Sequence, residues 1–360
     1  MTNPRLEHVR AAMAEQHLDA LWIGSAANRR YLSGFTGSAG WLFVSSTSAV
    51  LLTDGRYVAQ ARSQAPDFSV ELVTRSQEMA AFKQTGEASS GRRIGLEANH
   101  VTLDQWRRWF EPIDADWAFT TGLVEGLRCQ KDATELAAIE TAAQVADLTM
   151  AYAYSVARPG LSEQELAWML EVYLREHGAQ GVAFEFIIAS GPNSALPHAR
   201  PGDRLIQAGE PITIDLGARL PNGYHSDLTR TFCLGEPADA RFRDVYATVL
   251  AAHHAALAAL QPGLHGRAAD DAARQVIANA GYGEYFSHSL GHGVGLEVHE
   301  MPALAPSSQD TLPVNAVVTV EPGIYIPGWG GVRIEDLALI TPDGCRLLSH
   351  AAELPVIVRG

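Results

Sequence analysis

A chain of 360 residues is long enough for two domains, each with a core that needs no disulfide or structural metal. An apolar fraction of 47% and a charged fraction of 19% exclude intrinsic disorder for the body of the chain. The formal net charge of −14 argues against a protein that binds nucleic acid or anionic membranes by general electrostatic attraction.

Cysteine usage and the N-terminal residues indicate the compartment. Cys129, Cys233 and Cys345 are odd in number and widely spaced, which disfavours a disulfide framework and a cysteine-type zinc site. Residues 1–16 contain no apolar segment typical of a signal peptide, and no apolar run approaches the ~20 residues of a membrane span. We therefore expect a cytoplasmic protein in a reducing compartment, with no membrane partner.

The first part of the chain predicts an α/β domain over residues 1–127. Residues 31–40, YLSGFTGSAG, are rich in glycine and serine and are expected to form a loop. An amphipathic stretch over residues 6–17 leads into an apolar run over residues 19–24 before this loop. A helix is predicted over residues 103–110, and strands over residues 41–45, 49–53, 68–73 and 93–97. Strands mixed with helical segments indicate a sheet with helices packed on it.

The remainder, residues 128–360, is predicted to be one domain with two similar halves. A long alanine-rich helical pattern over residues 132–157 stops at a Pro-Gly pair, and Ser162 with Glu165 forms the capping signature of a second helix. The same order recurs from residue 241, with an alanine-rich helix, a Pro-Gly pair and a shorter helix. Strand-like segments follow each helix pair, which favours an internal duplication.

Two aspartates lie in segments that predict a β-hairpin. Residues 211–216 alternate apolar and polar side chains, which predicts a strand with one apolar face, and a second strand is expected over residues 226–232. In a hairpin centred on Pro221, Asp215 and Asp227 would lie opposite each other, where like charges are destabilising unless a cation binds between them. Two solvated carboxylates on a polar face are the alternative.

Three histidines occur close together in HSLGHGVGLEVHE, residues 288–300. His288, His292 and His299 are separated by glycines, which let the backbone approach a bound ion or substrate closely. The glycine spacing matches neither a phosphate-binding loop nor a dinucleotide fingerprint. Three histidines in this setting favour a ligand site over a purely structural role.

Two glutamates lie within apolar, strand-like runs. Residues 316–323 predict a strand that ends at Glu321, and residues 332–340 predict one that carries Glu335. An unpaired glutamate is costly to bury in such strands, so we expect both to bind a metal. A salt bridge is the alternative, with Arg333 as the candidate partner of Glu321.

The two aspartates, one of the histidines and the two glutamates form an oxygen-rich donor set with a single imidazole and no thiolate. Such donors suit a carboxylate-bridged pair of Mn²⁺, Co²⁺ or Zn²⁺ ions better than a structural zinc site. Two metals ~3.5–4 Å apart generate a hydroxide and stabilise an oxyanion, so the donor set predicts a hydrolase.

At these residues the sequence resembles the Xaa-Pro peptidase family, which comprises prolidase and aminopeptidase P within the pita-bread metallopeptidase superfamily. The resemblance covers essentially the whole chain and rests on SGFTGSAG, LRCQKDATELAAIETA, TIDLGA, SDLTRTF, HSLGHGVGLEVHE, VEPGIY and VRIED. It implies an α/β creatinase-like N-terminal domain over residues 1–127. It also implies an α+β pita-bread catalytic domain with an internal pseudo-two-fold repeat over residues 128–360, and a homodimer.

The resemblance further implies two divalent metal ions per subunit, with Mn²⁺ favoured over Co²⁺ or Zn²⁺. Asp215 resembles the terminal ligand of one metal, and Asp227 and Glu335 resemble the bridging carboxylates. His292 and Glu321 resemble the ligands of the second metal, and Glu321 also matches the general base that accepts a proton from the attacking water. The implied substrate is a peptide with proline at its second position.

Other residues resemble groups that contact this substrate. His198, in ALPHARPGD, resembles the histidine that assists proton transfer and steadies the intermediate. His299 resembles a histidine near the scissile bond, and Tyr325 and Arg333 match positions on the proline side of the site. His288 is expected to support the ligands without binding metal.

The interval between Asp215 and Asp227 departs from the family pattern. It is one residue longer than usual, with Pro221 as the insertion in the turn. Both aspartates stay on predicted strands, so we expect metal binding to survive, whereas the geometry of the hairpin tip is left open.

Two substrate classes compete within the family. A prolidase takes only dipeptides and needs a cation for the free carboxylate, for which the candidates are Arg333, Arg200, or Arg29 and Arg30 reaching in from another subunit. An aminopeptidase P leaves that side open to longer peptides. The short chain favours the dipeptidase.

Three other readings agree less well with the sequence. The filled ligand positions argue against a pita-bread interaction protein that has lost its metals, and against a metal-free creatinase-type amidinohydrolase. A domain such as residues 1–127 is not normally present in methionine aminopeptidase.

Overall fold

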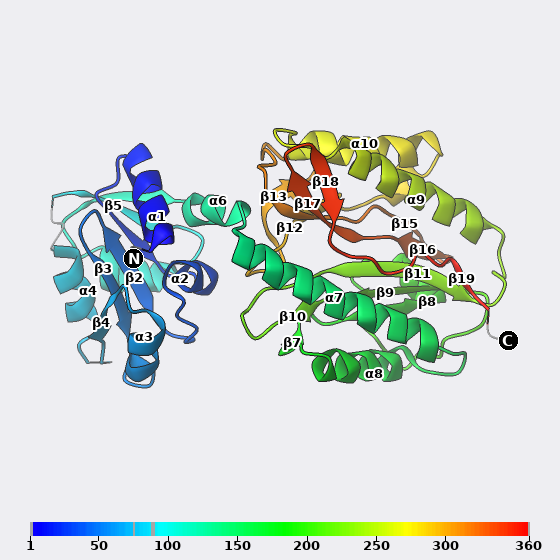
Figure 1. Cartoon of the computed structure of the whole chain (residues 1–360), viewed down its shortest axis with the longest axis horizontal. Helices are drawn as coiled ribbons and strands as arrows, with labels where there is room; N and C mark the ends of the chain where they lie inside the picture. The colour runs from blue at the N-terminus through cyan, green and yellow to red at the C-terminus, as the bar shows by residue number, and fades with distance from the viewer. Residues whose placement is uncertain (1–2, 75, 88–90, 359–360) are drawn as a thin grey trace. The chain divides into compact units, whose positions relative to one another are not determined.

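The computed structural model describes residues 3–74, 76–87 and 91–358 (Figure 1). Contacts within the chain divide it into two compact units, Met1–Arg128 and Cys129–Gly360. Across the described ranges, every helix is too short or too polar to cross a membrane.

The first unit is a six-stranded mixed sheet in the order β4-β3-β2-β1-β5-β6, with helices packed on it. Its elements are α1 (Pro4–Glu15), β1 (Ala20–Ile23), α2 (Ala26–Ser33), β2 (Trp41–Ser45), β3 (Ala49–Thr53), α3 (Val58–Gln64), β4 (Ser69–Leu72), α4 (Glu78–Glu87), β5 (Arg93–Glu97), α5 (Leu103–Gln105), the π-helical turn Trp106–Phe110, β6 (Asp116–Thr120) and α6 (Leu123–Cys129). The strands predicted at residues 41–45, 49–53 and 93–97 are confirmed with these bounds.

The predicted loop over residues 31–40 is partly wrong, because its first three residues complete helix α2. The hydroxyl of Ser25 caps this helix by accepting a hydrogen bond from the Asn28 backbone N–H at 3.3 Å. Gly34, with φ of 77°, ends it in the left-handed conformation that favours glycine. A helix of eight residues is too short to show a hydrophobic period, so the sequence pattern did not reveal it.

The second unit contains a four-stranded sheet, β19-β11-β9-β8, a five-stranded sheet, β13-β12-β14-β17-β18, and the two-stranded pairs β10-β7 and β15-β16. Its helices are α7 (Ala133–Val156), α8 (Glu163–Glu176), α9 (Arg241–Ala259) and α10 (Gly266–Asn279), with 3₁₀ turns at Gly191–Ala195 and Gly283–Tyr285. Its strands are β7 (Gly181–Val182), β8 (Ile187–Ser190), β9 (Pro211–Leu216), β10 (Ala218–Arg219), β11 (Leu228–Leu234), β12 (Gly291–Gly293), β13 (Glu300–Leu304), β14 (Val317–Val320), β15 (Gly323–Ile326), β16 (Gly330–Arg333), β17 (Asp336–Thr341), β18 (Gly344–Leu347) and β19 (Val356–Ile357).

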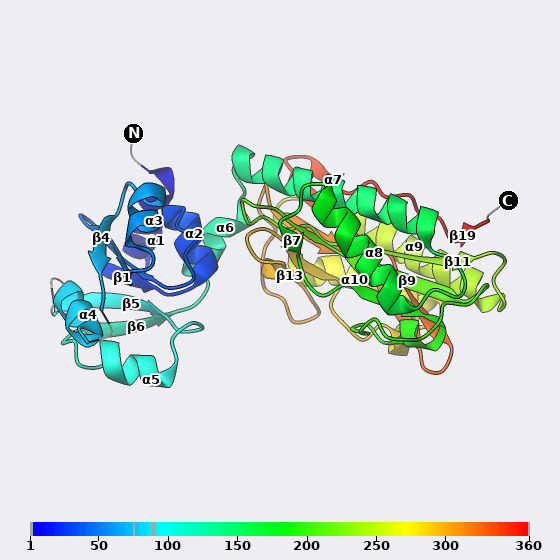
Figure 2. The same cartoon turned by 90° about the horizontal axis from the view of Figure 1, so that it is seen from below.

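The two halves of this unit repeat one arrangement. Gly160 and Gly263 end the two Pro-Gly turns with φ of 89° and 81°. Directly after them, each second helix is entered through an isolated antiparallel bridge, from Ser162 in the first half and from His265 in the second. Figure 1 shows the strands between the α7–α8 pair and the α9–α10 pair, and Figure 2 shows α7 and α8 from their outer side.

The capping signature predicted from the sequence is confirmed at α8. The Ser162 hydroxyl accepts from the Glu165 backbone N–H at 3.1 Å, and the Glu165 carboxylate accepts from the Ser162 backbone N–H at 2.8 Å. Asp132 and Glu135 form the same reciprocal cap at the start of α7.

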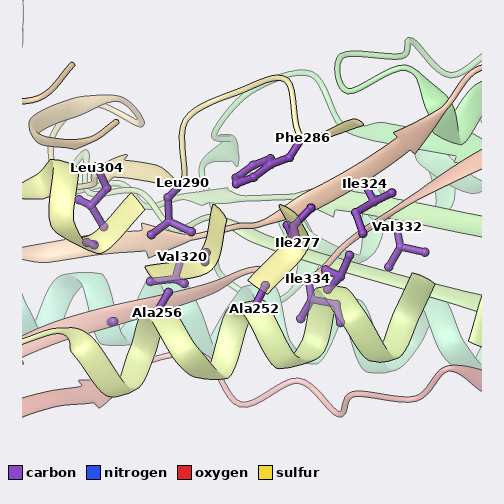
Figure 3. Close-up of a cluster of buried hydrophobic side chains, with 14 of the residues drawn as sticks. Ala252, Ala256, Ile277, Phe286, Leu290, Leu304, Val320, Ile324, Val332 and Ile334 are labelled. Carbon is purple, nitrogen blue, oxygen red and sulfur yellow. The ribbon is translucent and has the colours of Figure 1, made fainter. Parts of the chain in front are cut away.

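Strands of the second half bury their apolar faces against α9 and α10. Figure 3 shows Ala252 and Ala256 of α9 and Ile277 of α10 facing Val320, Ile334 and their neighbours in one apolar cluster. Alanines on α9 allow the helix to lie close to the strands, while Ile277 fills the space between the two helices and the sheet.

Two strand predictions need correction. All six residues of β9 are buried, including Thr213 and Asp215, so the strand has no solvated face. The single strand predicted over residues 332–340 is two strands, β16 and β17, which belong to different sheets and are separated by Ile334 and Glu335. Periodicity does not reveal such a break, because apolar residues continue through it.

We expect Ile277→Ala to lower the free energy of unfolding of the second unit by about 2–5 kcal/mol, because it leaves a cavity in the core. Gln275→Ala is the matched control, since Gln275 is exposed on the same helix and its change should be within about 0.5 kcal/mol. Urea titration followed by circular dichroism measures both. Equal midpoints for the two variants would contradict the packing.

Candidate metal centre

A cavity of about 540 Å³ opens in the second unit and gathers most of the predicted site residues. Phe184, Ile187, Pro197 and Val298 contribute apolar wall. The predicted residues that line it are His198, Asp215, Asp227, His288, His292, His299, Glu321, Arg333 and Glu335. Tyr325 is not among the described residues that line the cavity; it is 6% exposed and lies behind Arg333.

The first two carboxylates come from the antiparallel pair β9 and β11. Their register places Thr229, rather than Asp227, opposite Asp215. The predicted hairpin centre at Pro221 is therefore wrong by one residue, and the register is centred on Asn222. Asp227 lies diagonally from Asp215 on the same side of the pair, so both carboxylates still enter the cavity.

The two glutamates enter from the second sheet. Val320 of β14 pairs with Asp336 of β17, so Glu321 and Glu335 lie directly beyond the last pair of this ladder. The backbone N–H of Glu335 donates to the carbonyl of Thr229 at 3.0 Å, which joins the second sheet to β11. The duplicated halves thus deliver two carboxylates each.

His292 lies on β12, beside the glutamates. Its Nε2 is 3.3 Å from Glu321 Oε1 and 3.8 Å from Asp227 Oδ2. The backbone N–H of His292 donates to the Thr319 hydroxyl at 3.0 Å, and this hydroxyl donates to Glu321 Oε1 at 3.2 Å. One β-strand hydroxyl therefore holds both residues in place.

Burial and mutual repulsion dominate the electrostatics of the carboxylates. Asp215, Asp227 and Glu335 each place one oxygen within 4.8 Å of the other two. Burial, with the charge of its neighbours, raises the pKa of Asp227 and of Glu335 well above the usual carboxyl value. Burial also raises the pKa of Asp215, although the Arg333 guanidinium acts in the opposite direction.

Glu321 differs from its neighbours. Burial alone would raise its pKa, but the hydrogen bond and positive charge of His292 outweigh burial and hold the pKa of Glu321 at about 2. Burial acts to lower the pKa of His292, yet Glu321 raises it above the ordinary histidine value. Glu321 is therefore ionised at neutral pH.

The donor set fits divalent metal ions. Within the described part of the chain, Asp215 Oδ1 and Glu335 Oε1 are buried oxygens without a hydrogen-bond partner. Buried charged oxygens without partners cost several kcal/mol unless they are protonated or bind a cation. Carboxylate oxygens with one imidazole match the donors that Mn²⁺, Co²⁺ and Zn²⁺ accept.

Arg333 pairs with Asp215, so the salt bridge considered between Arg333 and Glu321 is wrong. Its guanidinium donates to Asp215 Oδ2 at 2.6 Å, to the Tyr325 hydroxyl at 2.8 Å and to the Thr229 hydroxyl at 3.1 Å. Only 3% of Arg333 is exposed. Its side chain is therefore committed to holding one carboxylate oxygen, which leaves the other oxygen directed at the cluster.

His288 supports this arrangement from behind. Its Nδ1 is 2.8 Å from the carbonyl of Ser289, so Nδ1 carries the proton, and Nε2 accepts from the Tyr325 hydroxyl at 2.8 Å. Burial lowers the pKa of His288 and raises the pKa of Tyr325 to about 12, which keeps both groups neutral. The hydrogen bonds therefore run from Arg333 to Tyr325 to His288.

Sequence reasoning missed Thr229 as a site residue. Its hydroxyl donates to Glu335 Oε2 at 2.7 Å while it accepts from Arg333. The signal was its spacing, because Asp227, Thr229 and Thr231 alternate at the period of one strand face.

Helix α10 also supports the site, through a pair that sequence reasoning did not single out. Asp270, which is fully buried, binds the Leu290 backbone N–H at 2.9 Å and pairs with Arg274. Arg274 donates to the carbonyls of Phe286 and His288 at 2.9 and 2.8 Å. The pair thus fixes the segment that leads into His292.

Comparisons with known proteins agree with this architecture. The metallopeptidase family M24 matches residues 137–342, and the Creatinase/Prolidase N-terminal domain matches residues 5–130. The Xaa-Pro dipeptidase of Pyrococcus furiosus is 35% identical, over 96% of this chain and 97% of that protein.

Solved structures show the same likeness. The Xaa-Pro dipeptidase from Bacillus anthracis has a TM-score of 0.92 and 39% identity, over 98% of this chain and 99% of that one. The X-Pro aminopeptidase from Thermotoga maritima MSB8 has a TM-score of 0.88 and 36% identity, with the same coverage of both chains.

The fold and the site define a two-domain metallopeptidase, with a creatinase-like domain followed by a pita-bread catalytic domain, as the sequence predicted. The chain belongs to the M24 metallopeptidase family.

Asp227→Asn should relieve the charge repulsion of the metal-free cluster and, at the same time, weaken its binding of metal ions. The raised pKa means that the folded protein binds this proton more tightly than the unfolded chain, so ionisation destabilises the fold as pH rises above the unfolded value of about 4. In chelator-treated protein, we expect the variant to have the higher thermal midpoint, with a larger difference at pH 8 than at pH 5. With Mn²⁺ the order should reverse, and peptidase activity should fall at least about 100-fold.

Asp271→Asn is the matched control, because Asp271 is an exposed carboxylate on α10 and should change neither midpoint. A full Mn²⁺-dependent rise in the midpoint of Asp227→Asn would contradict the site.

Thr229→Val should weaken metal binding by about 10–100-fold, because Glu335 loses the donor that orients it. Thr141→Val, at an exposed position of α7, controls for loss of a threonine hydroxyl. Titration of the stripped protein with Mn²⁺ by calorimetry measures both affinities. Unchanged affinity in Thr229→Val would show that Glu335 needs no such orientation.

Proposed function

We propose that this chain is an Xaa-Pro dipeptidase that uses two divalent metal ions. The observation that carries the proposal is the convergence of four carboxylates and His292 on one cavity, with two buried oxygens that have no hydrogen-bond partner in the described residues. The dipeptidases named among its relatives support the same activity. The substrate class is a dipeptide with proline at its second position.

We infer that Asp215 holds one metal, that Asp227 and Glu335 bridge both, and that His292 and Glu321 hold the other. The metals would supply a hydroxide nucleophile at neutral pH and stabilise the developing oxyanion. Mn²⁺ is the favoured ion, because the donors are mostly hard oxygens.

Residues of the chain would move the protons. Glu321, which is ionised at neutral pH, is the group placed to accept a proton from the attacking water. The proline nitrogen carries no N–H in the substrate, so it must receive a proton as it leaves.

His198 and His299 are exposed at the cavity. His198 is the proposed group for proton transfer, and His299 is the proposed hydrogen-bond partner of the substrate near the scissile bond. Burial, together with the nearby charge of His292, lowers the pKa of His299, so its ring is neutral at neutral pH. The ring centroids of His292 and His299 lie 4.1 Å apart, which places His299 directly beside the metal ligands.

Arg333 and Tyr325 take a positioning role in this proposal. Arg333 is held by Asp215, Tyr325 and Thr229, and Tyr325 lies behind it. Neither is free to bind the proline side of a substrate directly. A homodimer and a cytoplasmic location stay predictions from the sequence.

Hydrolysis of Ala-Pro, Ala-Pro-Ala and Ala-Ala by chelator-stripped protein, with and without Mn²⁺, tests the proposal. We expect Mn²⁺-dependent cleavage of Ala-Pro, because the donor set suits divalent metal ions and the relatives of this chain include Xaa-Pro dipeptidases. Ala-Ala should be a poor substrate.

Comparable or faster cleavage of Ala-Pro-Ala would instead assign an aminopeptidase P. No cleavage of any substrate with Mn²⁺ or Co²⁺ would overturn the peptidase assignment.

A further inference from the structure

A dipeptide differs from a longer peptide in the carboxylate that directly follows its proline. A site selects for that carboxylate by offering it a cation, because an unpaired charge is costly to hold in a cavity. The described residues that line this cavity include two arginines, Arg333 and Arg200.

Arg333 is not available. It is 3% exposed, and its three nitrogens already donate to Asp215, Tyr325 and Thr229. Removing it from Asp215 would leave a further buried carboxylate without its partner.

Arg29 and Arg30, the candidates in the first unit, are not among the described residues that line the cavity. Arg29 is also 3% exposed, and its guanidinium donates to the carbonyls of Gly24, Gly37 and Gly40 at 3.1, 2.9 and 2.8 Å. It holds the glycine-rich loop that follows α2. Arg30 lies next to it on α2 and is not among the described residues that line the cavity.

Arg200 is the remaining arginine of the cavity wall, and its side chain is 84% exposed. Its contact within the described residues is an ion pair with Glu185, in which Nε lies 3.7 Å from Oε2, beyond hydrogen-bond distance. Glu185 also lines the cavity and is 67% exposed. An ion pair this loose and solvated contributes little to stability. Arg200 can therefore readily exchange Glu185 for another carboxylate.

The loop that carries Arg200 is held in place at both ends. Buried Glu163 accepts from the Ser190 backbone N–H at 2.8 Å and from the Gly202 backbone N–H at 3.4 Å. The Pro197 carbonyl accepts from Arg333 at 3.3 Å, so the middle of the loop is tied to the metal centre. Arg200 therefore extends from a preorganised backbone, two residues from His198.

We propose that Arg200 binds the free carboxylate of the Xaa-Pro dipeptide and that Glu185 is the partner it exchanges. This assignment rests on the proposed dipeptidase function and names the group that limits it to dipeptides. Charge-assisted pairing of a guanidinium with a carboxylate gives selectivity that a neutral peptide carbonyl does not reproduce. Glu185 competes for Arg200 and repels the same substrate carboxylate.

The test compares Ala-Pro with Ala-prolinamide, which has the same proline but no C-terminal carboxylate, in the Mn²⁺-loaded full-length chain. In Arg200→Ala, we expect KM for Ala-Pro to rise about 10-fold or more while kcat changes little. KM for Ala-prolinamide should stay within about 2-fold of wild type, because it never used the charge. In Glu185→Gln, KM for Ala-Pro should fall.

Arg346→Ala is the matched control, because Arg346 is a half-exposed arginine of β18 paired with Glu140 outside the cavity. It should alter neither substrate. Salt adds a second readout: wild-type KM for Ala-Pro should rise with ionic strength more steeply than that of Arg200→Ala.

If the wild type is active and Arg200→Ala changes KM equally for both substrates, or for neither, the role of Arg200 is wrong. The dipeptidase function would still stand in that case. A metal-loaded wild type that cleaves neither substrate would overturn the dipeptidase function, and the role of Arg200 with it.

Discussion

Asp215, Asp227, Glu321 and Glu335 repel one another on the wall of one cavity, and the strands of the second unit hold them together there. Burial raises the pKa of three of them, so the cluster destabilises the fold whenever these groups are ionised without a counter-charge. Among the described residues, His292 pairs with Glu321 and Arg333 pairs with Asp215, and both pairs offset part of this repulsion. The same deficit of positive charge gives the site its affinity for divalent cations.

The duplicated fold explains how so unfavourable a cluster is assembled. Each half contributes a helix pair and a set of strands, and each set of strands carries two of the carboxylates into the cavity. The link between the halves is polar: Thr229 binds Glu335 through both its hydroxyl and its carbonyl. Helices supply two further carboxylates to loops near the site, with Glu163 on the His198 loop and Asp270 on the segment before His292.

The polar groups of the site are arranged in two functional layers. Behind the carboxylates, Arg333, Tyr325 and His288 are buried and fully engaged, and they fix charge and orientation. At the mouth of the cavity, His198, His299 and Arg200 are exposed and loosely held. In the proposed function, this division would separate metal binding from substrate recognition, because a group whose hydrogen bonds are already used to hold a carboxylate has none left for a substrate.

The sequence by itself determined the two-part organisation and the duplicated helix pairs with their caps, because periodicity, Pro-Gly turns and helix caps are local properties. The metal donors stay a prediction that rests on the chemistry of Asp, Glu and His and on the family motifs. Only the tertiary structure decided the one-residue shift of the β9–β11 register, the break between β16 and β17, the pairing of Arg333 with Asp215 rather than Glu321, and the place of Tyr325 behind the cavity wall. Thr229 and Arg333 are 104 residues apart, and Arg333 and Asp215 are 118 apart. Such contacts depend on how two sheets pack against each other, and a local sequence pattern does not predict that packing.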